Sequence, residues 1–397
     1  MYVRAVITAA EFAERRARLR DDANRAGASG FVLFGPDYVN YFTGFFFLSN
    51  ERPIVYVEST GGESAIFVPE FEVERTREET SFERIESYPE YPGREHPMTI
   101  LARVLGDLGL RGRIAADQDG YPGILGYRGP ALSAVTGAEI IVVADEIERM
   151  LARKSAAEIE LIRESGRWCA HAHRLLQEYS LPGATEAEVS LRVAREATLA
   201  MLAELGDRYG GRLGSADGVK AGYRGQIGRR SAWAHAISHD IAFQEGDVLV
   251  SETGAPVSGY NAELERALVI GSPTDEMRRL FDHTVAAQQV AFDALRPGVT
   301  CADVDGAVMR YFEEHDLLQY WRQHTGHAIG LRNHEAPFLD VGDDTLVEPG
   351  MVFTIEPGLY DANVGGFRHS DTVVVTEAGI EKLTDYPSDL DSLTIPA

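Results

Sequence analysis

The chain has 397 residues, of which 44% are hydrophobic, and it carries a formal net charge of −24 at pH 7. This length is enough for two or three domains of about 150 residues each. The excess of acidic residues argues against nucleic acid and against an anionic membrane as partners, because both attract basic surfaces.

Three further features of the sequence predict a cytoplasmic protein. No stretch approaches the roughly 18 uninterrupted apolar residues of a membrane-spanning helix. The N-terminal segment has no long apolar run ahead of a cleavage site, so no signal peptide is expected. The two cysteines, Cys169 and Cys301, offer no disulfide framework, which fits a reducing compartment.

The first part of the chain alternates predicted strands with predicted helices. Thr8 and Glu11 form a capping box, which predicts a charged amphipathic helix immediately after it. Residues 99–108 predict another helix. Apolar runs predict strands at residues 30–34, 54–57, 65–68 and 113–116. This pattern indicates an α/β domain.

A junction between two domains is expected at residues 147–155. Ser155 and Glu158 form a second capping box there, which predicts the start of a long helix. The expected domains are therefore residues 1–148 and residues 149–397.

A Gly-rich, basic segment covers residues 208–230. It lacks the spacing of a phosphate-binding loop. We therefore expect it to form a loop that flanks a pocket and shapes specificity.

Three short motifs of the second domain occur twice, in the same order. They are LPGATEAEV and RPGVTCADV (181–189 and 296–304), EGDVLVSETG and EPGMVFTIEPG (245–254 and 348–358), and HAI (starting at residues 235 and 327). The repetition predicts two similar halves related by a pseudo-two-fold axis. Such a pairing would put Glu252 and Glu356 in equivalent strands that face one pocket.

Acidic residues are concentrated on a predicted β-hairpin, whose strands are residues 248–252 and 262–270. Successive side chains of a strand point to opposite faces, so Glu263 and Glu265 share one face. The hairpin can bring Glu252 beside that face. Because burying charge is costly, such a cluster is expected to hold a metal ion, a cationic substrate or a shared proton. The alternative is a surface hairpin with solvated Glu side chains.

Three longer strings resemble a known family. They are GHAIGLRNHEAP, MVFTIEPGLY and GGFRHSDTVVVTEAG, at residues 326–337, 351–360 and 365–379. With the acidic hairpin, their order and spacing resemble the pita-bread family of methionine aminopeptidase, Xaa-Pro dipeptidase and creatinase, and the N-terminal domain resembles that of the creatinase–prolidase branch. The resemblance implies an α/β N-terminal domain, an α+β pita-bread C-terminal domain with an internal pseudo-two-fold repeat, and a homodimer.

The resemblance also implies a site for divalent ions. Metallopeptidases of this family bind two ions through Asp, Asp, His, Glu and Glu, and these roles fall on Glu252, Glu263, His327, Glu356 and Ser370. A serine hydroxyl is a poor substitute for the last carboxylate, because hard cations prefer anionic oxygen. We therefore expect at most one ion, such as Mn, Zn, Co or Fe, bound by the first four residues.

The creatinase branch works without metal, and there a hairpin Glu contacts the guanidinium group of the substrate. Glu265 occupies the matching position, and Glu265 and His327 are the predicted substrate-binding residues. The predicted catalytic residues are His235, His334 and Glu356. His235 matches a histidine that both branches share, and imidazole suits acid–base chemistry because its pKa lies near neutrality.

These residues predict a hydrolase that cleaves a C–N bond in a small molecule or a dipeptide, like an Xaa-Pro dipeptidase or like creatinase. An inactive pita-bread module that binds peptides or proteins is the alternative. Loss of the fifth ligand at Ser370 is compatible with that alternative, whereas the retained histidines and Glu356 argue against it.

Overall fold

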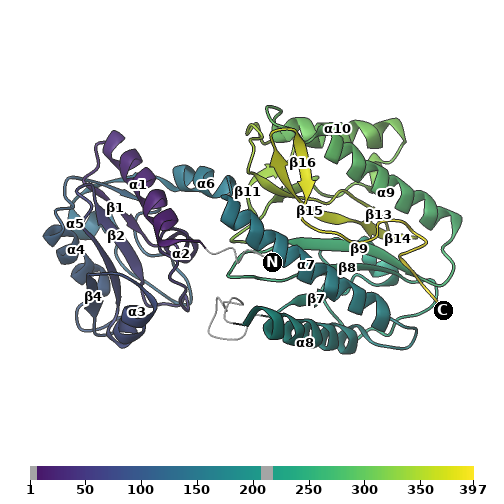
Figure 1. The fold of residues 1–397 in the computed structure, drawn as a ribbon, viewed down its shortest axis with the longest axis horizontal. Helices are drawn as coiled ribbons and strands as arrows, with labels where there is room; N and C mark the ends of the chain where they lie inside the picture. Colours follow the sequence, from purple (N-terminus) through teal and green to yellow (C-terminus); the bar gives the residue numbers. More distant parts are fainter. Residues whose placement is uncertain (1–6, 207–217) are drawn as a thin grey trace. The chain divides into compact units, whose positions relative to one another are not determined.

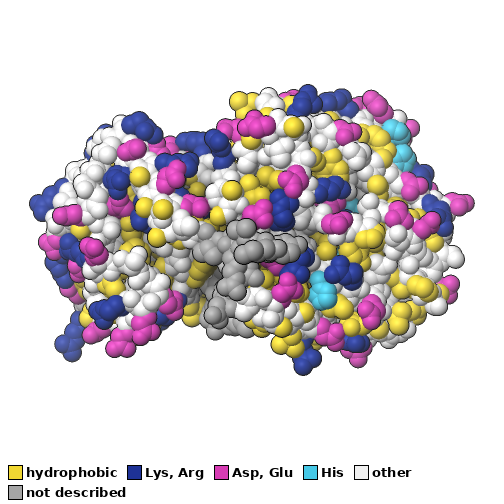
Figure 2. Space-filling model, in the orientation of Figure 1, with side chains coloured by type: hydrophobic (Ala, Val, Ile, Leu, Met, Phe, Trp, Pro, Cys, Tyr) yellow, Lys and Arg dark blue, Asp and Glu magenta, His cyan; other side chains and the backbone are white. Residues whose placement is uncertain are grey.

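The computed structural model describes residues 7–206 and 218–397. They form two compact units, divided between Leu151 and Ala152, and each unit contains its own large sheet (Figure 1). Residues 208–217 of the predicted Gly-rich loop lie outside the described residues. The prediction of a loop is wrong for Lys220–Gly222, which form strand β7. None of the described helices combines the length and apolar character that a membrane span requires. On the face drawn in Figure 2, acidic and basic side chains are interspersed.

The N-terminal unit is built on a six-stranded mixed sheet with the order β4-β3-β2-β1-β5-β6. Its strands are β1 (Gly30–Leu33), β2 (Val55–Ser59), β3 (Ser64–Pro69), β4 (Ile85–Tyr88), β5 (Arg113–Ala116) and β6 (Glu139–Val142). Its helices are α1 (Ala9–Arg25), α2 (Pro36–Thr43), α3 (Val73–Glu79), α4 (Pro97–Asp107), α5 (Leu132–Thr136) and α6 (Ala144–Ala152). The four strands and two helices predicted for this region are confirmed, and the Thr8 side chain caps α1 by accepting from the Glu11 amide at 3.2 Å.

The C-terminal unit is built on a nine-stranded sheet whose main path runs β11-β10-β12-β15-β9-β8-β7. The strands of its first half are β7 (Lys220–Gly222), β8 (Val248–Gly254) and β9 (Glu263–Ile270). Those of the second half are β10 (Gly326–Ala328), β11 (Glu335–Leu339), β12 (Val352–Ile355) and β15 (Ser370–Thr376). Off this path, β16 (Gly379–Lys382) pairs with β15 and β17 (Thr394–Ile395) pairs with β9. The strands β13 (Gly358–Asp361) and β14 (Gly365–Arg368) form a separate hairpin.

The internal repeat predicted from the sequence is present. Each half begins with two long helices, α7 (Ala156–Tyr179) and α8 (Glu186–Leu205) in the first, α9 (Asp275–Ala294) and α10 (Cys301–Glu314) in the second. Thr185 and Thr300 cap α8 and α10 through full capping boxes, as the repeated motifs predict. The strands β7, β8 and β9 mirror β10, β12 and β15, and the inner pair β9 and β15 lies antiparallel at the centre.

The register of the central strands sets the chemistry of one sheet face. Glu252 of β8 lies opposite Glu265 of β9, and Ser370 of β15 lies opposite Glu265 on the other side. Glu263 is two residues from Glu265 and therefore shares its face. The predicted grouping of the three hairpin carboxylates is confirmed.

Candidate metal centre

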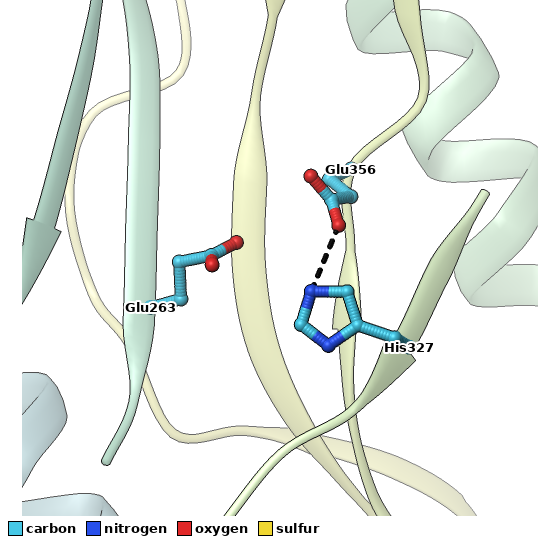
Figure 3. Close-up of side chains that lie close together, drawn as sticks. All are labelled: Glu263, His327 and Glu356. Atoms are coloured by element: carbon cyan, nitrogen blue, oxygen red, sulfur yellow. Dashed lines mark ion pairs between the residues drawn. The ribbon is translucent and has the colours of Figure 1, made fainter. Parts of the chain in front are cut away.

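Three side chains from three strand regions converge on this face. Glu263 begins β9, His327 is the middle residue of β10, and Glu356 directly follows β12. One ligand atom from each side chain can be chosen so that all three lie within 4.8 Å of one another. Figure 3 shows the Glu263 carboxylate pointing toward the pair formed by His327 and Glu356.

The imidazole of His327 is fully buried and held in one orientation. Its Nδ1 lies 2.9 Å from the carbonyl oxygen of Ala328. Because a carbonyl oxygen accepts, Nδ1 carries a proton and donates it. Its Nε2 faces the carboxylates, 3.1 Å from Oε1 of Glu356. A histidine whose other nitrogen donates to a carbonyl is oriented as metal-binding histidines are.

The two carboxylates give this site a strong attraction for positive charge. Burial opposes protonation of His327, but the contact with Glu356 and the charges of Glu356 and Glu263 raise its pKa to about 9. Burial, followed by the charges of Glu356 and Glu265, raises the pKa of Glu263 well above its usual range. Burial alone would raise the pKa of Glu356, but His327 and Arg368 lower it to about 2.

The two remaining hairpin carboxylates are paired with arginines of the chain. Arg224 reaches Oε2 of Glu252 at 2.7 Å and lies 3.7 Å from Oε1 of Glu265. Arg368 binds both oxygens of Glu265, with one N–O distance of 2.6 Å, and lies 3.9 Å from Oε2 of Glu356. Glu252, predicted as a metal ligand, therefore lies outside the three-residue group. The role of Glu265 in substrate binding stays a prediction, and its carboxylate already holds a guanidinium group.

Ser370 lies on the site face, at the position where the resemblance implies a fifth ligand. Its hydroxyl donates to Oε1 of Glu263 at 2.9 Å, and its side chain is fully buried. The serine therefore stabilises the orientation of one carboxylate of the group.

Of the two other predicted histidines, only His334 contacts the group. His334 stacks on His327, with ring centroids 3.8 Å apart, and burial, followed by the charge of His327, lowers its pKa. His235 is exposed and follows Ala234, whose carbonyl accepts from Gln226 at 3.0 Å and from Arg368 at 3.5 Å. The backbone at His235 is thus tied to the arginine that pairs with Glu265.

Sequence analysis did not identify the arginines or Gln226. Arg368 is in one of the quoted strings, two residues before Ser370, and alternation along an extended chain could have placed both on one side. No such sequence pattern points to Arg224, because its pairing with Glu252 depends on the fold of the Gly-rich segment. The buried ion pair between Lys154 and Glu335, at 2.8 Å, was also missed, although Glu335 lies within the first of the quoted strings.

The donors of the three-residue group fit a divalent cation. Carboxylate oxygen and imidazole nitrogen are ligands that Mn, Fe, Co and Zn accept. The fixed Nδ1–H of His327 leaves its other nitrogen directed at the two carboxylates. The group can therefore hold an ion with two oxygen ligands and one nitrogen ligand.

Comparison with known families and proteins agrees with this arrangement. The family model described as "Metallopeptidase family M24" matches residues 160–377, and the model described as "Creatinase/Prolidase N-terminal domain" matches residues 15–150. Metallopeptidases of this family use divalent metals, which agrees with the predicted cofactor.

Several relatives cover nearly the whole chain. A probable dipeptidase PepE from Mycobacterium tuberculosis is 29% identical over 92% of this chain and 92% of its own, and a Pyrococcus furiosus Xaa-Pro dipeptidase is 28% identical over 84% and 88%. The crystal structure of dipeptidase PepE from Mycobacterium ulcerans has a TM-score of 0.80 at 26% identity and covers 97% of this chain and 98% of its own. An Xaa-Pro dipeptidase from Bacillus anthracis has the same fold, with a TM-score of 0.80 at 24% identity over 97% of this chain and 100% of its own. The chain belongs to metallopeptidase family M24, in the two-domain creatinase–prolidase branch.

Proposed function

We propose that the protein is a metallopeptidase that hydrolyses dipeptides, with Xaa-Pro dipeptides as its substrate class, and that Glu263, His327 and Glu356 hold its catalytic ion. The observation that carries the proposal is the convergence of these three donors within 4.8 Å. The substrate class is supported by relatives named dipeptidase and Xaa-Pro dipeptidase that align along most of the chain.

A bound divalent ion would supply Lewis-acid chemistry, by polarising the peptide carbonyl and lowering the pKa of water. Proton transfer is assigned to Glu356, whose Oε2 is the oxygen nearer to Arg368. His235, which follows the Ala234 carbonyl that accepts from Arg368, is assigned to take or give a proton in the reaction. His334, held against His327, would donate a hydrogen bond to the oxyanion that forms on the carbonyl oxygen.

Two other functions were considered, a creatinase-like reaction and peptide binding without catalysis. A creatinase-like reaction would place a substrate guanidinium beside Glu265, but Arg368 already binds both oxygens of that carboxylate. A peptide-binding module without catalysis would not need the group of Glu263, His327 and Glu356. Both observations favour the metallopeptidase.

The test is an assay of the purified protein with a panel of Xaa-Pro dipeptides, other dipeptides and creatine. We expect turnover of Xaa-Pro dipeptides that is lost after treatment with EDTA and restored by Mn, Co or Zn. Creatine turnover that resists EDTA would contradict the proposal and favour the creatinase-like reaction. Specific peptide binding without any turnover would favour the binding module. The predicted homodimer is a separate proposal, which the molar mass in solution decides.

A further inference from the structure

Four carboxylates and two guanidinium groups share the face that holds the three-residue group. The carboxylates belong to Glu252, Glu263, Glu265 and Glu356, and the guanidinium groups to Arg224 and Arg368. Burial raises the pKa of Glu263 while no cation is bound, but once a cation ionises all four carboxylates they carry two more charges than the two arginines neutralise. One divalent cation would balance this difference, and a second would leave an excess of positive charge.

The arginines are not spread evenly over these carboxylates. Arg224 lies 2.7 Å from Glu252 and 3.7 Å from Glu265, and Arg368 binds both oxygens of Glu265. A cation that approached Glu252 and Glu265 would therefore meet the guanidinium of Arg224 beside Glu252 and that of Arg368 on both oxygens of Glu265. Like charges this close repel strongly when water is largely excluded.

The third potential ligand beside Glu252 and Glu265 is a serine hydroxyl that already makes a hydrogen bond. Ser370 lies opposite Glu265 in the sheet and donates its proton to Oε1 of Glu263. It supplies no negative charge to a cation near Glu265. Ser370 and both arginines therefore favour the side of the face that contains Glu263, His327 and Glu356.

We infer that Arg224 and Arg368 act as fixed cations of this centre, so that it binds a single divalent ion through Glu263, His327 and Glu356 while Glu252 and Glu265 stay paired with the arginines. The inference rests on the proposed metal-dependent function and specifies how that metal is bound. Arg224 is the informative residue, because its side chain is 43% exposed and approaches the carboxylates from the segment that follows β7, not from the core of the sheet.

The first experiment measures Mn²⁺ binding to the full-length protein by calorimetry and by metal analysis after dialysis. We expect one ion per chain, with the six-line electron paramagnetic resonance spectrum of isolated Mn²⁺. Two ions per chain with a spin-coupled spectrum would overturn the inference and leave the proposed peptidase function standing. Absence of any bound ion would overturn both.

The second experiment separates the carboxylates by matched substitutions. We expect Glu263→Gln and Glu356→Gln to weaken Mn²⁺ binding by more than about 100-fold, which exceeds the usual effect of losing a residue behind the ligands. Glu252→Gln should weaken binding by about tenfold or less, because its carboxylate serves Arg224 and affects the ion only through charge. Equal losses in all three variants would overturn the inference.

The third experiment removes the fixed charge itself. Arg224→Met removes the guanidinium group and leaves a shorter, unbranched side chain without charge. We expect this variant to bind the first ion at least about tenfold more tightly, or to gain a second, weaker ion, because one carboxylate is no longer neutralised. Arg224→Lys retains the charge and should bind one ion with nearly the original affinity. Wild-type stoichiometry and affinity in Arg224→Met, with an unchanged melting curve, would overturn the role of Arg224.

Discussion

At the scale of single residues, the metal centre depends on which side chains point at the ion and which are already paired with another side chain of the protein. His327 illustrates the first case, since the carbonyl of Ala328 fixes its ring and leaves Nε2 toward Glu356. Glu265 illustrates the second, since Arg368 covers both of its oxygens. Residue type alone does not distinguish these cases, because both residues are buried and both can ligate a metal.

Ser370 gives a prediction at this scale. Ser370→Glu adds a carboxylate beside Glu263 and should strengthen Mn²⁺ binding at least about tenfold, because affinity for hard cations rises with the number of charged oxygen ligands. Calorimetry measures the change. Ser370→Ala, which removes the hydroxyl without adding charge, is the control and should stay within a few-fold of wild type. If Ser370→Glu is folded and binds Mn²⁺ no more tightly, the carboxylate of Glu263 does not face the ion.

The sequence predicted the positions of the acidic residues well and their partners poorly. Glu263 and Glu356 could be placed because strand alternation and the internal repeat are local or periodic signals. The pairing of Arg368 with Glu265 joins residues 103 positions apart, and it depends on how β14 lies against β9. Arg224 was missed for a similar reason, since its backbone adopts a positive φ of 49° that no local pattern announced.

At the scale of secondary-structure elements, buried ion pairs fix the loops that carry the site. Lys154 follows α6, and its ammonium group lies 2.8 Å from Glu335 at the start of β11. Glu335 also accepts from the amide of Arg332 at 2.9 Å, which closes the turn that carries His334. The two charged side chains are almost completely buried, so each depends on the other for stabilisation.

Lys154→Met should therefore lower the free energy of unfolding by about 3–5 kcal/mol, because it leaves the carboxylate of Glu335 buried without its partner. Chemical denaturation of the C-terminal unit measures this change. The double substitution Lys154→Met with Glu335→Leu should recover most of the loss. Arg153→Met is the matched control: its pair with Glu348 is exposed and should contribute less than about 1 kcal/mol. Equal effects at the two neighbouring positions would contradict this interpretation.

The contact between α7 and β8 contains a second buried titratable group. His173 of α7 is fully buried, and its two ring nitrogens lie 2.9 Å from Thr253 Oγ1 and 2.7 Å from Ser251 Oγ. Burial, followed by the charge of Arg266, lowers its pKa well below the usual value. The folded protein therefore keeps this histidine neutral at a pH where the unfolded chain would protonate it.

The sign of the pH effect follows from this difference. Below the pKa of about 6.5 in the unfolded chain, unfolding takes up a proton at His173, so stability falls as the pH falls. The loss should reach about 2 kcal/mol at pH 5 if the folded histidine remains neutral. Denaturation of wild type and of His173→Asn at pH 7.5 and at pH 5 measures it. The variant should lose less stability on acidification, and the same loss in both proteins would contradict the assignment to His173.

At the scale of the whole molecule, the C-terminal unit consists of two similar halves, and their strands carry the three-residue group. The mirrored strand order brings β9 and β15 together, and Glu263, His327 and Glu356 come from both halves. The first half contributes Glu263 to the group, and the second half contributes His327 and Glu356. The three-residue group therefore exists only where the duplicated halves pair.

We expect one divalent ion among Glu263, His327 and Glu356. Anomalous diffraction from crystals grown with Mn²⁺ tests it most directly, because the method locates the ion without relying on activity. We predict one strong anomalous peak per chain, within ligand distance of an oxygen of each carboxylate and of Nε2 of His327. A peak between Glu252 and Glu265, or no peak on this face of the sheet, would contradict the account.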